Sequence, residues 1–199
     1  MKTLQNYITE KILINKNSKL AYNYYPKTKD ELKDIIKQRI ESEGNDCNLN
    51  DIDTSNITDM SNLFADSDFN GNISKWNVSN VTDMHSMFHE SVFTGDISNW
   101  DVSNVTKMNS MFRYSKFNGD ISTWDVSNVE NMRYMFAWSN FNGDISNWDV
   151  SNVKNMVDMF WHSKFNNDIS NWDVSNVTNS VNIFYACHIE EKYKPKFKK

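Results

Sequence analysis

The sequence predicts an α/β repeat solenoid, in which one 24-residue unit recurs about five and a half times and forms one short parallel strand and one short helix per unit. Three observations lead to this fold class. Aromatic residues recur at a fixed interval, the apolar spacing changes within each unit, and the segment before the repeats has the pattern of an amphipathic helix. We expect a helical N-terminal capping region over residues 1–48, the repeats over 49–188, and a basic C-terminal tail over 189–199.

Tryptophan and phenylalanine define the repeat, because both recur with a strict period of 24 residues. The consensus is D-I-S-x-W-D-V-S-N-V-T-x-M-x-x-M-F-x-x-S-x-F-N-G. The aromatic columns are Trp76, Trp100, Trp124, Trp148 and Trp172; Phe64, Phe88, Phe112, Phe136, Phe160 and Phe184; and Phe69, Phe93, Phe117, Phe141 and Phe165. Units this short cannot fold alone, so stacked copies must bury one another's apolar columns. Invariant columns are therefore expected to face the core, and variable columns to face solvent.

Each unit divides into parts with different apolar spacing. In the unit that begins at Asp96, the alternation W-x-V over residues 100–102 indicates a short strand with Trp and Val pointing inward. The V-x-x-M-x-x-M-F spacing over residues 105–112 places four apolar groups on one helical face, and Ser103 and Asn104 precede it as capping residues. Asn118-Gly119 closes the unit as a turn.

These motifs resemble a known family. I-x-x-W-x-V resembles the L-x-x-L-x-L of leucine-rich repeats, and V-T-x-M-x-x-M-F-x-x-S-x-F is similar to the repeats of the bacterial BspA-like proteins. Cys187 stands where other copies have serine, and cysteine is the usual residue of that family. The resemblance covers about residues 49–188. It implies a curved, leucine-rich-repeat-like solenoid with a parallel sheet on its concave side, and relatives that are largely bacterial surface proteins binding host or matrix proteins.

The two ends do not repeat. A helix is expected to open at Thr28 and to stop at Gly44, with Leu32, Ile35 and Ile36 on its apolar stripe. The segment Thr3 to Ile14 could form an earlier helix or a strand. The N-terminal region is interpreted as a cap for the open end of the array, or else as a small docking domain. The lysine-rich tail is either a solvated end or a weak anionic contact.

Composition and charge exclude several functions. A net charge of −5 argues against unspecific nucleic-acid binding, and no apolar run is long enough for membrane insertion. Cys47 and Cys187 flank the array about 24 Å apart if copies rise by roughly 4.8 Å, whereas a disulfide needs about 7 Å. Two unpaired thiols and the lack of a signal-peptide pattern predict a cytoplasmic or otherwise reducing location.

No motif for catalysis is present, so we expect no enzyme activity, no cofactor and no metal site. The four histidines lie at variable positions. His85 and His89, four residues apart, could share a metal with Glu90, but the favoured interpretation is that they are surface histidines.

An aspartate column follows the tryptophans, and two interpretations of it remain open. Each carboxylate could accept hydrogen bonds from the backbone of its own turn, or the column could form an acidic strip for a basic partner. Its members are Asp101, Asp125, Asp149 and Asp173. The tryptophan column is expected in the core, with an exposed sugar platform as the alternative.

Large aromatic residues at variable positions predict a recognition surface. Such side chains are costly to expose and typical of interface hot spots, although they could instead cover grooves between copies. They are Tyr114, Tyr134, Trp138, Trp161 and Tyr185. The sequence therefore favours a non-enzymatic interaction module that binds a protein partner, or itself, through these residues or the aspartate column. The alternatives are a structural or accessory protein of a phage or mobile element, and a surface adhesin or carbohydrate-binding array.

Overall fold

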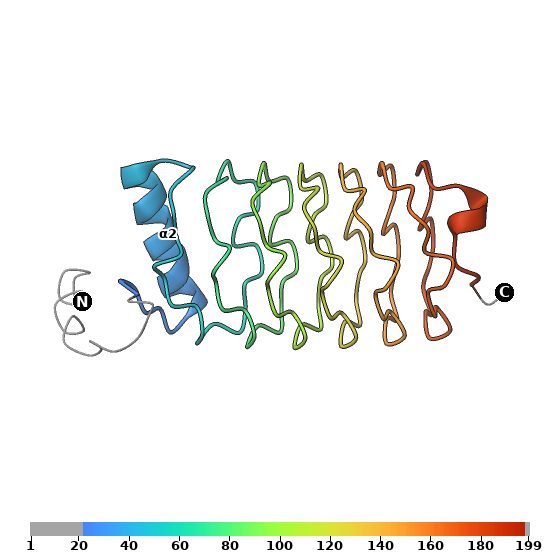
Figure 1. The fold of residues 1–199 in the computed structure, drawn as a ribbon, viewed down its shortest axis with the longest axis horizontal. Helices are drawn as coiled ribbons and strands as arrows, with labels where there is room; N and C mark the ends of the chain where they lie inside the picture. Colours follow the sequence, from blue (N-terminus) through green and yellow to red (C-terminus); the bar gives the residue numbers. More distant parts are fainter. Residues whose placement is uncertain (1–21, 198–199) are drawn as a thin grey trace.

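The computed structural model describes residues 22–197, and in it the 24-residue units follow one another as stacked coils of chain. Figure 1 shows the coils in a row between helix α2 at one end and a short 3-10 helix, η1, at the other. Helix α2 spans Lys29–Glu43, and η1 spans Glu191–Tyr193. The segment Thr3 to Ile14 lies outside the described residues.

The predicted fold class is wrong, because the units contain neither a strand nor a helix. Within residues 22–197 the coils are joined by isolated parallel bridges, one or two residue pairs at each step, and these do not extend into a sheet. The main series of bridged residues is Asp59, Asp83, Lys107, Asn131, Asn155 and Asn179. The concave parallel sheet that the leucine-rich-repeat resemblance implied is therefore absent.

The segment expected to be helical is instead a chain of three reverse turns. The amide of Met111 donates to the carbonyl of Met108, that of Arg113 to Ser110, and that of Ser115 to Phe112, each at 3.2 Å. Each turn joins residues three apart, so a chain of such turns gives the same apolar spacing of three that indicated a helix in the sequence. Ser110 and Tyr114 occupy the third positions of the first and last turns and have φ of 58° and 57°, as a type II turn requires.

The amides that do not close these turns donate hydrogen bonds to the next coil. Met108, Ser110, Phe112 and Tyr114 donate to carbonyls 23 residues further along the chain, at 3.1, 2.8, 2.9 and 2.9 Å. The same four bonds recur at every step, and all of them run from an amide to a carbonyl of the following coil. We call this segment, residues 108–115 and its equivalents in the other coils, the turn ladder. Its hydrogen bonds all point one way along the stack.

Aromatic columns fill the interior. The five tryptophans of the repeat column are 3–5% exposed, which confirms that this column belongs to the core. Each indole Nε1 donates to a backbone carbonyl of the preceding coil, as Trp124 does to Ile97 at 3.1 Å. Phenylalanine rings of successive coils stack nearly parallel, for example Phe88 on Phe112 with centroids 5.7 Å apart. Burying the indole with its N–H bonded avoids the cost of an unpaired polar group.

Polar side chains connect the coils along another edge. Asn104 Nδ2 donates to the carbonyl of Ser79 at 2.7 Å, and Thr106 Oγ1 donates to that of Thr82 at 3.2 Å. These side-chain hydrogen bonds tie each copy to the preceding one. Ser103 and Asn104 do not cap a helix, however, because they form a turn between Val102 and Val105. The expected turn at Asn118-Gly119 is also absent from this coil.

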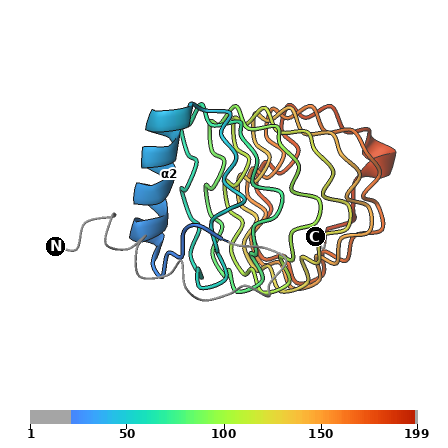
Figure 2. The ribbon, with the colours of Figure 1, turned by 60° about the vertical axis from the view of Figure 1, so that its left-hand side comes forward.

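The two ends of the stack differ. Helix α2 begins after Thr28, whose side chain accepts from the amide of Glu31, and it buries Leu32, Ile35 and Ile36. Both views show it lying against the first coil, and it shares the continuous core with it (Figures 1 and 2). At the other end, Tyr193 and Phe197 pack against the core. Neither helix in the described range is long and apolar enough to cross a membrane.

Candidate functional site: the aromatic row

Exposed aromatic rings lie next to one another at the C-terminal end of the turn ladder in successive coils. We call Tyr114, Trp138, Trp161, His162 and Tyr185 the aromatic row. Tyr114 stacks on Trp138 of the next coil with ring centroids 5.8 Å apart, and Trp138 stacks on His162 at 4.1 Å. Trp161 meets Trp138 edge-on at 5.9 Å, and Tyr185 meets His162 edge-on at 5.9 Å. The rings therefore form one continuous surface across four coils.

An arginine joins Tyr134 to this row. The Arg113 guanidinium carbon lies 5.0 Å from the ring centroid of Tyr114 and 4.8 Å from that of Tyr134, within cation–π range of both. Arg113 Nε is buried and has no hydrogen-bond partner within the described chain. The guanidinium is thus held by two rings and not by a carboxylate.

The exposure of the row distinguishes it from the rest of the surface. Four large apolar or aromatic side chains are exposed between residues 22 and 197, and three of them belong to the row: Tyr114 at 40%, Trp138 at 44% and Tyr185 at 61%. Tyr134 and Trp161 are half-buried. The position of Tyr114 and Trp138 is occupied by Asp66 and Glu90 in the first two coils, so the fold does not require an aromatic ring there.

The backbone beneath the row makes this choice of residues costly. Tyr114, Tyr134, Trp138 and His162 have φ between 53° and 57°, in the left-handed region that bulky residues rarely occupy. An L-residue in this conformation costs about 1–2 kcal/mol. Glycine or asparagine would suit the turn better, so neither exposure nor backbone geometry accounts for aromatic side chains here.

In the aspartate column, each carboxylate binds the turn that follows it. Asp101 Oδ1 accepts from the amide and the hydroxyl of Ser103, at 3.1 and 2.6 Å. Asp125, Asp149 and Asp173 accept from the amides of the serines two residues on, each at 3.0 Å. All four carboxylates are exposed. Of the two interpretations, the geometry favours local turn formation.

These hydrogen bonds also act on the ionisation of the carboxyls. Bonds from the Ser103 hydroxyl and amide lower the pKa of Asp101, and those from Ser151 lower the pKa of Asp149 in the same way. In the column that opens each unit, the Ser98 amide and hydroxyl lower the pKa of Asp96. The charged forms are favoured because they accept two hydrogen bonds.

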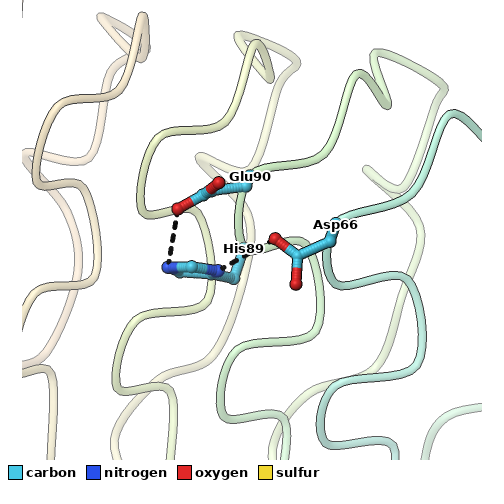
Figure 3. A group of neighbouring side chains, drawn as sticks. All are labelled: Asp66, His89 and Glu90. Carbon is cyan, nitrogen blue, oxygen red and sulfur yellow. Dashed lines mark ion pairs between the residues drawn. The ribbon is translucent and has the colours of Figure 1, made fainter.

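The histidines do not form a shared metal site. His85 contacts Asp83 at 2.7 Å, whereas His89 belongs to a different group with Asp66 and Glu90 (Figure 3). In that group Asp66 lies 3.9 Å from Nδ1 of His89, and Glu90 lies 3.8 Å from Nε2. Because the two carboxylates approach different ring nitrogens, the arrangement is that of a surface ion-pair group.

Sequence reasoning missed two members of the surface. His162 and Arg113 are polar residues, so a search for exposed apolar side chains did not select them. His162 lies 24 residues after Trp138, and Trp138 lies 24 after Tyr114. Reading each variable column along the stack, and not each coil by itself, would have identified His162.

The fold and this surface define a tandem-repeat protein whose units stack in register and display variable side chains outside. The chain belongs to the family described as Mycoplasma protein of unknown function, DUF285, whose model matches residues 31–139 and again residues 90–194. The two overlapping matches reflect the repetition within the chain. No curated protein and no solved structure matches it significantly.

Proposed function

We propose that this protein is a non-enzymatic interaction module that binds a protein partner through the aromatic row. The observation that carries the proposal is the placement of exposed Tyr and Trp side chains at left-handed backbone positions, where neither the core nor the turn needs them. Tyr, Trp and Arg are the residues that most often dominate binding energy at protein interfaces. Strain kept at such positions is typical of functional surfaces.

The stacking within the row favours a protein over a sugar. Sugars bind aromatic platforms by lying on open ring faces. Here Trp138 stacks against Tyr114 of the preceding coil and against His162 of the following coil, with ring planes within 20° in both pairs. The edge of Trp138, and not its faces, is therefore left for a partner. Edge contacts suit apolar side chains and carbonyl oxygens of a protein surface.

The proposal is tested by truncating the exposed rings. A Tyr114→Ala, Trp138→Ala, Trp161→Ala variant should keep the melting temperature within a few degrees, because the side chains contribute little to the core. It should lose the protein that co-purifies with the wild type from the native cell. Single hot-spot truncations are expected to weaken the dissociation constant by about 30-fold, the equivalent of about 2 kcal/mol.

Asn147→Ala serves as the matched control, because Asn147 is exposed and lies outside the row. It should bind as the wild type does. Undiminished capture of the partner by the triple variant would refute the role of the row. Binding to a glycan array by the wild type, lost in the triple variant, would replace the protein partner with a carbohydrate.

We also infer kinship between these repeats and those of BspA-like proteins, which rests on the shared V-T-x-M-x-x-M-F-x-x-S-x-F pattern and on Cys187. Cys187 takes the place of the column serine and contacts the previous one, with its Sγ 3.4 Å from Ser163 Oγ. A solved BspA-like structure should show the same three chained turns. A true helix in that segment would count against the kinship.

A further inference from the structure

The last coil leaves its turn ladder open. In each earlier coil, four amides donate to the following coil, as Met156, Asp158, Phe160 and His162 do to residues 179, 181, 183 and 185. The equivalent amides of the last coil have no acceptor within residues 22–197. They belong to Ser180, Asn182, Phe184 and Ala186, and we call them the donor row.

The segment that follows does not cover the donor row. Residues 187–193 run beside the previous coil on another side, where the amide of Ile169 donates to the carbonyl of Tyr193 at 3.0 Å. Next to the donor row, Val181 is 60% exposed and Tyr185 is 61% exposed. The first coil differs, because Ser61, which is equivalent to Val181, is only 3% exposed beside α2.

The direction of the hydrogen bonds determines what can bind there. Every outward backbone group of the donor row is an N–H, so an occupant must supply a matching row of carbonyl oxygens. A second copy approaching with its own last coil would set donors against donors. A second copy approaching with its first coil would meet α2. The complementary occupant is therefore a segment of another protein that can adopt the same chained turns.

The charge at this end favours an acidic segment. Residues 177–189 contain no lysine, arginine, aspartate or glutamate, and the aligned amides present partial positive charge. Lys192, Lys194 and Lys196 line a hollow of about 800 Å³ beside the same coil together with Glu191. Lys192 pairs with Glu190 at 3.0 Å and Lys194 with Glu191 at 2.6 Å, so Lys196 leaves the segment with a small positive excess. Lys194 Nζ lies 5.6 Å from the ring centroid of Phe184, the residue whose amide belongs to the donor row.

We propose that the donor row is a docking site for an acidic segment of a partner protein, which adopts the chained turns of the other coils and adds to the stack as its next coil by main-chain hydrogen bonds. This mode of binding is the counterpart of strand addition at a sheet edge. The site does not depend on the aromatic row, although Tyr185 borders both.

The probe is a synthetic peptide with the sequence of residues 80–91, which offers the carbonyls of residues 83, 85, 87 and 89 and carries Asp83 and Glu90. In the free protein, the donor-row amides should exchange with solvent at least about 100-fold faster than those of Met156, Asp158, Phe160 and His162. Adding the peptide should slow them at least about 10-fold and shift their NMR resonances. A peptide with lysine in place of both acids should bind more weakly.

Ser180→Pro removes one donor, and Asn179 before it is already in the bridged, extended conformation that a following proline favours. It should weaken peptide binding, whereas Ser180→Ala, which keeps the amide, should not. Trp138→Ala should bind the peptide normally, so failure of the aromatic row and failure of the donor row can be told apart.

Three results would overturn the proposal. The donor-row amides could already be protected in the free protein, the peptide could bind Ser180→Pro as tightly as Ser180→Ala, or the protein could self-associate through this end in sedimentation experiments. The last result would assign the donor row to a second copy.

Discussion

A single oxygen organises the turn after each tryptophan. Asp101 binds the amide and the hydroxyl of Ser103, and Asn77 makes the same two contacts with Ser79 one coil earlier. An amide oxygen therefore serves as well as a carboxylate in this place. What the carboxylate adds is a dependence on pH, because its charged form accepts these bonds more strongly than its protonated form does.

We predict that Asp101→Asn combined with Asp149→Asn flattens the acid side of the stability profile. The pKa of each carboxyl is lowered in the folded state from an ordinary value of 3.8, so the unfolded state takes up protons first as the pH falls. The stabilisation is full above 3.8 and is lost as the pH drops through the lower folded pKa. Denaturant titrations between pH 5 and pH 2.5 should show a smaller loss in the variant.

At pH 7 the same variant should differ from the wild type by less than about 0.5 kcal/mol, because the turn oxygen is retained. Equal losses of stability in both proteins below pH 4 would show that these carboxylates do not contribute to the acid response.

At the scale of the element, the turn ladder explains which expectations from sequence succeeded. Burial of Met108, Met111 and Phe112 followed from their spacing, and each is fully buried. The helix did not follow, because a spacing of three fits both a helical face and chained three-residue turns. The deciding feature, a left-handed residue at Ser110 and Tyr114, has no marker in this coil, since neither residue is glycine or asparagine. Its marker lies in other coils, where Asn62, Asp66, Asp158 and Asn182 occupy the equivalent positions.

Relieving the backbone at a position without an aromatic side chain should stabilise the protein. Ser110 has φ of 58° and uses its amide, which glycine retains, to bind Arg133. Ser110→Gly is expected to raise the free energy of unfolding by about 1 kcal/mol. Chemical denaturation measures the change. Asn109→Gly, whose φ is not positive, should instead lower it by about 0.5–1 kcal/mol; a gain in both variants would contradict the strain argument.

At the scale of the whole molecule, the period of 24 residues is the constraint that every column obeys. The sequence predicted units in register, with tryptophan inside and variable aromatic residues outside, because recurrence at a fixed interval leaves few other arrangements. The aromatic row could be anticipated in part for the same reason. The donor row could not be anticipated, because it depends on the direction of the backbone hydrogen bonds. The pattern of side chains in a sequence does not indicate that direction.

Removing one full period should therefore leave a folded protein. Deletion of residues 120–143 joins Gly119 to Asp144 and preserves every column, so the shortened stack is expected to melt cooperatively at a lower temperature. Small-angle scattering should show it shorter by about 5 Å. Deletion of residues 120–142 breaks the register by one residue and should prevent folding. Tryptophan fluorescence distinguishes the two, because only the first variant keeps its indoles buried.

Helix α2 has a consequence for association that follows from the one-way hydrogen bonds. The first coil turns the carbonyls of Asp59, Ser61, Leu63 and Ala65 away from the second coil, and none of them accepts a hydrogen bond within the described chain. They match the donor row of another molecule, and α2, anchored by Lys29 on Asp59 at 3.0 Å, lies against that end. The helix therefore blocks the binding of one molecule's donor row to the first coil of the next. Without α2, both ends of the stack would be complementary, and molecules could add head to tail into a fibre.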